Sequence, residues 1–413
     1  MKILSLLIAE DKEAKENIRD TEILKQILKM IGSYPAYDVD LTVLEAALNV
    51  LSHSVTLSFG NQNFVRDFNC FSILSKILTK ITKQCTDSKE ENKTLITVLE
   101  NICLCLSNMC FHNPSNQEAL LKQGIIKQLL TILLSKKDKV WYLTTQIIQE
   151  MFFILVNTTD TNTQVQEYLL NVVREDLISA IDMYLLSDNY LISGHVALWI
   201  SHIAFNCKPA QELLANDVYV QRLLKLCDYK GLSLNEELSQ QITFFSLLAI
   251  INLTFSNPSA QQIIYEKGGI KLLCSLLSER IFEPKKTVCF ALSNIIRGNP
   301  ITQKELLSFD GLKLLLDLVS DEEDDELSKK AFNTLEDMNK FAIDGLYPLI
   351  IETTKHLIPL ENTIDISLDT NNVVLLDSKA INKEELVNCK EKLEKYFPIY
   401  NGLIYMDEGI LKQ

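Results

Sequence analysis

Residues 257–270 read Asn257-Pro-Ser-Ala-Gln-Gln-Ile-Ile-Tyr-Glu-Lys-Gly-Gly-Ile270, which is a turn, a short apolar helix and a second turn. Asn-Pro is a turn dipeptide, and Pro suits the first turn of the helix that follows it. The Gly pair suits a sharp corner, because Gly takes a left-handed backbone without steric cost. The same order recurs at Asn113 to Ile125 and at Asn299 to Leu312. The chain therefore contains an internal repeat.

Each copy continues into a Leu-rich helix, a polar gap and a third helix that ends in Asn. The second helix is apolar at helical spacing, as in Leu312, Leu315, Leu316 and Val319. One such unit cannot bury its apolar face alone, but stacked units share a continuous core. The period of roughly 42 to 50 residues lies in the armadillo/HEAT range. We expect an all-α fold, a right-handed armadillo/HEAT-like superhelical solenoid of about six to seven three-helix repeats.

Outward from these copies, fainter ones extend the repeat over residues 1–341. The expected units are 12–57, 58–112, 113–159, 160–206, 207–256, 257–298 and 299–341. Residues 342–413 depart from the pattern and predict an irregular C-terminal cap or, alternatively, a tail that reaches a partner or the concave groove. Within it, Ile364 to Leu368 and Val373 to Leu376 indicate a small hairpin, and Glu384 to Tyr396 indicates a helix.

Composition and charge argue against some classes of function. The formal charge of −14 argues against non-specific binding to nucleic acid, which needs clustered Lys and Arg. The ten Cys are scattered among apolar positions, as is typical of buried thiols in a reducing compartment. No stretch approaches the length of a membrane span. We expect an intracellular protein, cytoplasmic or nuclear or both.

A polar residue recurs near the end of the third helices, at Asn108, Asn157, His202, Asn252 and Asn294. Equivalent positions stack in a solenoid, so these side chains form a ladder. Asn carries donors and an acceptor, which suits it to bind the backbone of an extended peptide in a concave groove. Alternatively, each Asn ties down its own inter-repeat loop. Both interpretations stay open, and they are compatible.

The combination of Asn-Pro-x-x-Gln, Gly-Gly-Ile and Ala-Leu-Ser-Asn resembles armadillo repeats over most of residues 58–341. Leu292-Ser-Asn-Ile-Ile-Arg-Gly-Asn-Pro300 is similar to a repeat of the importin-α nuclear-import adaptors. In that family, Asn residues hold the main chain of a nuclear localisation signal, and a Trp one turn earlier packs on lysine stems. The resemblance implies that Asn108, Asn157, Asn252 and Asn294 grip a peptide.

The chain departs from importin-α at the Trp positions. Four residues before each ladder residue stand Leu104, Phe153, Leu198, Leu248 and Phe290, and the two Trp, Trp141 and Trp199, are off this register. Without aromatic slots, most of the cation–π grip on lysine is absent. We expect a groove that grips peptide backbone, with Phe153, Phe290 and Arg297 as secondary candidates.

A second resemblance is carried by Lys285-Lys-Thr-Val-Cys-Phe-Ala-Leu-Ser-Asn-Ile-Ile-Arg297. This stretch is similar to armadillo nucleotide-exchange factors of the 70-kDa heat-shock chaperones. The resemblance implies a third possible function, that of a nucleotide-exchange cofactor of such a chaperone. The other two are a protein-binding scaffold and a divergent importin-α-like nuclear import adaptor.

The sequence offers no catalytic residues, no metal ligands and no cofactor. Its five His form no zinc motif, and its Gly residues form no phosphate-binding loop. The acidic stretch from Ser320 to Glu326 predicts a solvated loop or, alternatively, a docking site for a basic segment. We expect a non-enzymatic scaffold that binds a protein or extended peptide, with no nucleic-acid partner.

Overall fold

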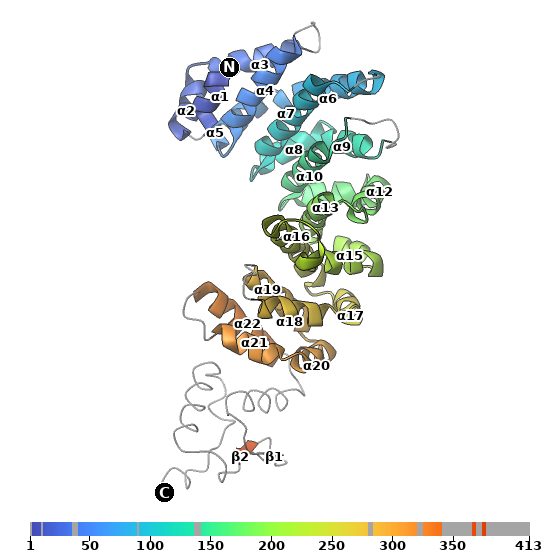
Figure 1. The fold of residues 1–413 in the computed structure, drawn as a ribbon. Helices are drawn as coiled ribbons and strands as arrows, with labels where there is room; N and C mark the ends of the chain where they lie inside the picture. The colour runs from blue at the N-terminus through green and yellow to red at the C-terminus, as the bar shows by residue number, and fades with distance from the viewer. Residues whose placement is uncertain are drawn as a thin grey trace. The chain divides into compact units, whose positions relative to one another are not determined.

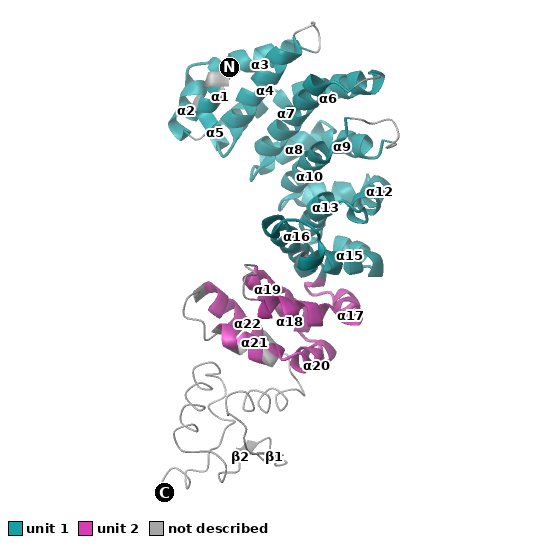
Figure 2. Cartoon of the chain, viewed as in Figure 1, with its two compact units in different colours: residues 1–253 teal, residues 254–413 magenta. Residues whose placement is uncertain are grey.

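The computed structural model describes residues 2–9, 11–34, 40–88, 91–135, 142–279, 284–319 and 325–340, together with two strands, 366–368 and 374–376. Three sequence features lie outside the described residues: Trp141, residues 320–324 of the acidic stretch, and the predicted helix at 384–396. The chain divides into two compact units, residues 1–253 and residues 254–413 (Figure 2).

In the first unit, α1 (Lys2–Ala9) precedes helices that recur in threes (Figure 1). These are α2 (Lys12–Asp20), α3 (Ile23–Ser33) and α4 (Leu41–Val55); α5 (Phe59–Asp67), α6 (Cys70–Asp87) and α7 (Lys93–Cys110); α8 (Pro114–Lys122), α9 (Ile125–Leu133) and α10 (Thr145–Thr159); α11 (Thr163–Asn171), α12 (Arg174–Leu185) and α13 (Tyr190–Ala204); and α14 (Lys208–Leu214), α15 (Asp217–Cys227) and α16 (Glu236–Thr254). A short 3₁₀ turn, Tyr229–Gly231, lies between α15 and α16.

The second unit begins with α17 (Pro258–Glu266), α18 (Gly269–Ser278) and α19 (Lys285–Ile296). A second triplet follows, α20 (Pro300–Ser308), α21 (Gly311–Val319) and α22 (Asp325–Lys340). Beyond these helices, the described residues are β1 (Ile366–Leu368) and β2 (Val374–Leu376), which pair antiparallel with Ser367 opposite Leu375.

The turn between repeats has one recurring geometry. The residue before the N-cap of α5, α8, α11, α14, α17 and α20 has a φ of 50–67°, at Leu57, His112, Thr161, Asn206, Ser256 and Gly298 in turn. The N-cap then accepts a bond from the new helix: Asn113 Oδ1 from the Asn116 amide at 3.2 Å, and Asn162 Oδ1 from the Val165 amide at 3.1 Å. Because an N-cap oxygen satisfies one of the helix's unpaired amides, the Asn-Pro signal marks where the repeats at Asn113, Asn257 and Asn299 begin.

The corner between first and second helices needs a left-handed residue. Gly124 and Gly268 both have a φ of 71°. In the last repeat, however, Asp310 takes this conformation with a φ of 56°, and Gly311 opens α21. Asp310, and not the Gly beside it, is therefore the left-handed residue of this corner. Asp and Asn tolerate the left-handed region better than most residues.

The core follows the third helices. In the first unit α4 packs on α7, α7 on α10, and α10 on α13. Their apolar stripes are buried, with Leu48, Leu106 and Leu155 at most 1% exposed. Stacked three-helix repeats with a continuous apolar core confirm the predicted all-α, armadillo-type solenoid class. No helix in the described ranges is long and apolar enough to cross a membrane.

Candidate binding face on the third helices

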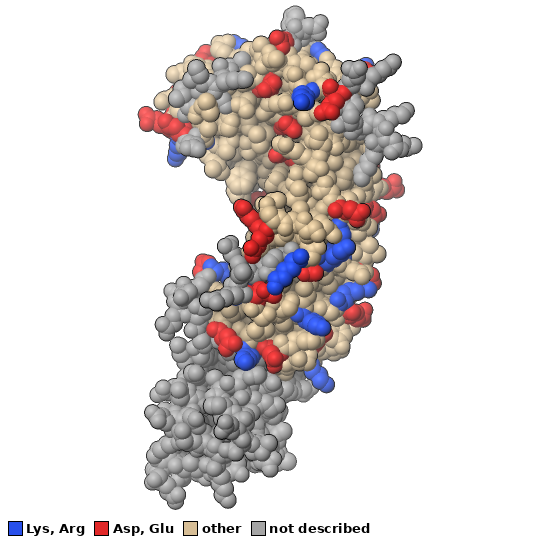
Figure 3. All heavy atoms as spheres, viewed as in Figure 1, with Lys and Arg blue, Asp and Glu red and all other residues tan. Residues whose placement is uncertain are grey.

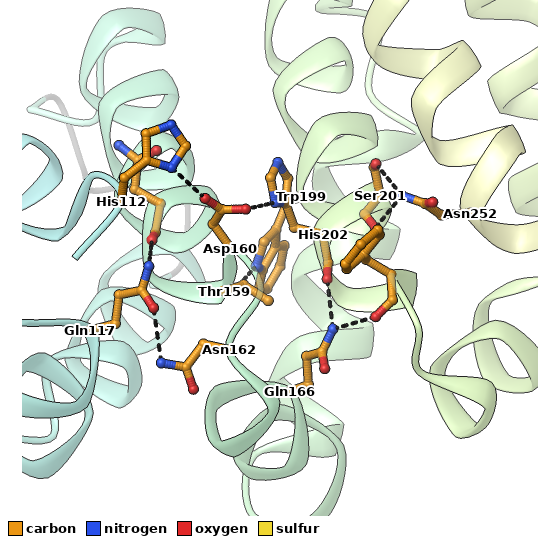
Figure 4. A network of polar contacts seen from close by, with 12 residues as sticks. His112, Gln117, Thr159, Asp160, Asn162, Gln166, Trp199, Ser201, His202 and Asn252 are labelled. Carbon is orange, nitrogen blue, oxygen red and sulfur yellow. Dashed lines mark hydrogen bonds and ion pairs between the residues drawn. The ribbon is translucent and has the colours of Figure 1, made fainter. Parts of the chain in front are cut away.

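Four of the five predicted ladder residues are held by a Gln from the first helix of their own repeat; Asn252 is the exception, because Gln211 donates to the Ala204 carbonyl instead. On α5, Gln62 donates its side-chain amide to the Asn108 carbonyl at 2.9 Å. The same bond joins Gln166 to His202 at 2.9 Å (Figure 4). It also joins Gln117 to Asn157 at 2.8 Å and Gln261 to Asn294 at 2.9 Å. The Gln of Asn-Pro-x-x-Gln therefore caps the carbonyl at the ladder position, where a helix end leaves acceptors unpaired.

The side chains of three ladder residues bind a Ser of the preceding repeat. Asn157 Nδ2 lies 2.8 Å from Ser107 Oγ. The equivalent pairs are Asn108 with Ser52 at 3.0 Å and Asn252 with Ser201 at 2.8 Å. Each Ser stands one residue before the ladder position of its own repeat. The ladder is therefore a chain of bonds between adjacent repeats, as well as a row of half-buried amides.

The side-chain oxygens of these three Asn differ from the side-chain nitrogens in their hydrogen bonding. Within the part of the chain that the structure describes, no donor bonds to the Oδ1 atom of Asn108, Asn157 or Asn252. The nitrogen is fixed by Ser, so the orientation of the amide is fixed as well. Each of these Asn thus presents a held acceptor on the third-helix face.

His202 departs from the pattern because Val156 stands where the preceding repeat would carry Ser. Its Nδ1 instead lies 3.3 Å from Asp160 Oδ1, and the other oxygen of Asp160 lies 3.1 Å from His112 Nδ1 (Figure 4). The hydrogen bond from His202 lowers the pKa of Asp160 below its ordinary value, although burial opposes the shift. One carboxylate thus links three consecutive repeats.

Of the secondary candidates, Phe153 lies in a row of aromatic rings on α10, α13 and α16. Its ring meets His195 edge-on with centroids 4.5 Å apart, and His195 meets Phe245 at 5.8 Å. His195 is buried, which lowers its pKa, and its Nδ1 lies 2.7 Å from the Leu191 carbonyl oxygen. The row thus consists of two Phe rings and one His ring from three successive third helices. Trp199 is buried in the core, where it donates to Thr159.

The remaining candidates belong to the second unit. Asn294 is buried, and Phe290, one turn earlier, is 42% exposed. The Lys330 ammonium lies 5.1 Å from the centre of the Phe290 ring. Arg297 forms the C-cap of α19 and donates its backbone amide to the Ser293 carbonyl. Phe290 is therefore an exposed aromatic residue on the third helix, beside a cation.

The ladder has one further member that sequence reasoning missed. Every ladder residue stands five positions before an N-cap, and the N-cap Ser58 assigns His53 to this position in the first repeat. Burial lowers the pKa of His53. The signal was hidden because Ser58 replaces the Asn that marks the later turns.

Most of the described Cys are buried. No group of His, Cys, Asp or Glu among them could hold a metal ion. The nine described Cys are free, and burial raises the pKa of the Cys70 thiol to about 12. A thiol with a raised pKa and no solvent contact is a poor nucleophile. On the face shown in Figure 3, charged side chains are scattered among uncharged ones.

Stacked three-helix repeats, Asn turns and a polar ladder define an armadillo-type helical-repeat protein. Within it, residues 229–342 match the family model of the SIL1/FES1/HPBP1 C-terminal domain. A search of curated proteins found no match to the chain.

Solved structures are similar in fold. An engineered protein from the Northeast Structural Genomics Consortium has a TM-score of 0.64 and 18% identity, covering 87% of this chain and 80% of that one. A second engineered protein from the same consortium has a TM-score of 0.52 and 20% identity, covering 64% of this chain and 97% of that one. A designed armadillo repeat protein has a TM-score of 0.42 and 19% identity, covering 76% and 100%. The first two similarities show a shared fold.

Proposed function

We propose that this chain is a non-enzymatic scaffold that holds an extended segment of a partner protein along its third helices. The observation that carries the proposal is the row of fixed acceptors at Asn108, Asn157 and Asn252. An extended segment presents backbone N–H groups at regular intervals, and such groups can donate to these oxygens without regard to sequence. The amides are already oriented by Ser, so little conformational entropy is lost when they bind.

The two interpretations of the ladder combine in this proposal. The nitrogen of each amide stabilises the contact between repeats, and the oxygen faces the partner. Phe153 and the neighbouring aromatic row add apolar contact for the side chains of the segment. We place the scaffold inside the cell, because nine free Cys are typical of a reducing compartment.

A pair of double variants tests this proposal. Ser107→Ala with Ser201→Ala removes the bonds to the two hydroxyls and keeps the Asn side chains, whose Nδ2 atoms also lie 3.3 and 2.9 Å from the Ser107 and Ser201 carbonyl oxygens. Asn157→Ala with Asn252→Ala removes the hydroxyl bonds, the carbonyl bonds and the acceptors. Partners captured by the tagged chain from a native lysate are identified by mass spectrometry, and their retention is compared between the variants.

We expect the Asn variant to lose a partner that the Ser variant keeps. Circular dichroism and melting temperature serve as controls, since the Asn variant also loses the bonds to the Ser107 and Ser201 carbonyls. Equal retention by both variants, at similar stability, would show that the ladder is structural only.

A second candidate function is nucleotide exchange on a 70-kDa heat-shock chaperone. The match of residues 229–342 to the SIL1/FES1/HPBP1 C-terminal domain favours it. In that stretch, Phe290 is an exposed aromatic residue on α19, and Lys286 pairs with Glu326 at 2.9 Å. An exposed aromatic residue flanked by charged groups is a common anchor for protein partners.

Release of a fluorescent ADP analogue from the chaperone tests this second function. We expect the chain to accelerate release, and Phe290→Ala to reduce the acceleration. The exposed Phe59, changed to Ala, is the control because it lies in the first unit, outside the matched residues. No acceleration by the unmodified chain excludes this function and leaves the scaffold proposal standing. The import-adaptor alternative predicts binding of a lysine-rich localisation signal, measured at two salt concentrations.

A further inference from the structure

One buried histidine stands at the centre of the aromatic row in the first unit. His195 on α13 is only 7% exposed. Phe153 on α10 and Phe245 on α16 both meet its ring in T-shaped contacts, with centroids 4.5 and 5.8 Å away. One Phe ring from each neighbouring repeat therefore contacts His195.

The two ring nitrogens of His195 have different roles. Nδ1 lies 2.7 Å from the Leu191 carbonyl oxygen. Because a carbonyl oxygen only accepts hydrogen bonds, Nδ1 carries a proton. The side-chain amide of Gln149 is the other polar group beside Nδ1, at 3.4 Å. Burial lowers the pKa of His195, which favours the neutral ring. In a neutral ring with its proton on Nδ1, Nε2 is a hydrogen-bond acceptor.

Nε2 of His195 has no partner. No residue that the structure describes donates a hydrogen bond to it. It is also not sealed from solvent, as the unpaired hydroxyl oxygens of Ser239 and Ser246 on α16 are. The small exposed part of His195 therefore includes Nε2. A side chain that is more than nine-tenths buried and keeps one accessible, unpaired acceptor is suited to a donor from outside.

The surroundings of this acceptor are aromatic. Phe153 is partly exposed and stands four residues before Asn157, on the same face of α10. Phe244 is 37% exposed, and its ring centre lies 6.2 Å from that of Phe245. Within the described ranges, His195 forms no ion pair. A ligand group for this place is therefore apolar over most of its surface and carries one donor.

The phenol of tyrosine meets both requirements. Its ring packs edge-to-face or offset against other aromatic rings, and its O–H donates from the far end of the ring. Serine and threonine also donate, but they bring little apolar area. A lysine or arginine would lose hydration here without gaining a counter-charge. The indole N–H of tryptophan lies on the side of a larger ring system.

We infer that Phe153, His195 and Phe245 form a subsite for a tyrosine side chain of the segment that lies along the third helices. The phenol O–H donates to Nε2 of His195, and the tyrosine ring packs beside the two Phe rings. This inference rests on the proposed scaffold function and names one side chain that the partner presents. It adds side-chain specificity to a ladder that binds only backbone.

The first test varies the ligand and leaves the chain unchanged. A fluorescent octapeptide in which tyrosine and serine alternate is titrated against the full chain and followed by anisotropy. Two matched peptides carry phenylalanine or O-methyltyrosine in place of tyrosine, and neither has the donor. We expect the tyrosine peptide to bind about three- to tenfold more tightly than either, which corresponds to one net hydrogen bond. Apolar contact alone would favour phenylalanine, the more hydrophobic residue.

A variant of the chain locates the subsite. His195→Phe removes the acceptor and keeps an aromatic ring, so the tyrosine and phenylalanine peptides should bind within about twofold of each other. The control is His112→Asn, at an exposed turn position whose φ of 50° suits Asn. It should keep the preference for tyrosine.

Contact is read directly from the ¹⁵N resonance of His195 Nε2, in a chain labelled at its histidines. The resonance is assigned by its absence from the His195→Phe spectrum. It should shift when the tyrosine peptide is added and stay in place when the phenylalanine peptide is added.

Three results would overturn the subsite. One is equal or tighter binding of the phenylalanine peptide by the unmodified chain, or no binding of any of the three peptides. Another is a tyrosine preference that survives in His195→Phe. The third is an Nε2 resonance that the tyrosine peptide does not move. If His195→Phe does not fold, the three peptides decide on the unmodified chain. None of these results touches the scaffold proposal, which is judged by native partner capture in the Asn157/Asn252 variant.

Discussion

The side-chain amide of Asn157 donates to the hydroxyl of Ser107 in the preceding repeat, with Nδ2 and Oγ 2.8 Å apart. This bond ties α10 to α7 at their C-terminal ends. It recurs wherever the preceding repeat of the first unit carries Ser one residue before the ladder. Where Val156 replaces that Ser, the ladder residue is His202 and its partner is Asp160. The identity of one residue thus determines which bond the next repeat makes.

This dependence predicts an energetic coupling between Val156 and His202. His202→Asn alone places an Asn beside Val156, whose side chain cannot accept a bond from its amide. Val156→Ser with His202→Asn restores the Ser–Asn pair of the neighbouring repeats. In a double-mutant cycle measured by urea denaturation, we expect a favourable coupling of about 1 kcal/mol. Coupling near zero would mean that the Ser and Asn positions vary independently.

Asp160→Asn should lower stability at neutral pH by roughly 0.5–1 kcal/mol, because the carboxylate joins His112 and His202. The folded-state pKa of Asp160 lies below its ordinary value. Its contribution is therefore present above the ordinary carboxyl pKa, and it is lost as the pH falls through the lowered one. Melting temperatures across this range should show the wild-type chain and the variant converging in acid. A gap that widens as the pH falls would reverse the assigned sign.

Glu150→Gln should have the opposite effect and stabilise the chain at neutral pH by roughly 0.5 kcal/mol. The pKa of Glu150 is raised in the folded state, so the folded chain binds its proton more tightly than the unfolded chain. Stability from this group therefore rises as the pH falls through the raised pKa. The advantage of the variant should shrink over the same window. A destabilised variant at pH 7 would reveal a counter-charge for Glu150.

Gly124→Ala should cost about 1 kcal/mol, because Gly124 has a φ of 71° and an added Cβ would have nothing within 4 Å. The loss of stability then comes from backbone strain alone. Gly124→Asn should cost less, since Asn69 takes the same left-handed conformation before α6. Urea midpoints of the two variants test this order. Equal losses would point to a role for Gly124 beyond its backbone.

Much of the fold followed from local signals. Asn-Pro-x-x-Gln predicts a turn and a helix start wherever it occurs, because a helix N-cap is a local requirement. The apolar spacing of the second and third helices is also a local signal, and it predicts which side of each helix is buried. The left-handed backbone of Asp310 was not predicted, because Gly, which stands beside it at position 311, is the commoner left-handed residue.

The contacts of the candidate site were less accessible to sequence reasoning. The Asn of the ladder could be aligned, because each stands a fixed distance before a turn. The bond between Asn157 and Ser107 could not be predicted, since the two residues lie in different repeats, about fifty positions apart. The contact between Phe153 and His195 was hidden for the same reason, since the two rings come from different repeats and meet only where α10 packs on α13.

The central claim is that a partner segment lies along the third helices. A photoreactive benzoylphenylalanine in place of Phe153, on the ladder face, tests it most directly. The matched control carries the same group at Val172, which follows α11 and is 66% exposed. After irradiation with the captured partner, the account predicts a covalent product at position 153 and none at position 172. A product at position 172 alone would contradict it.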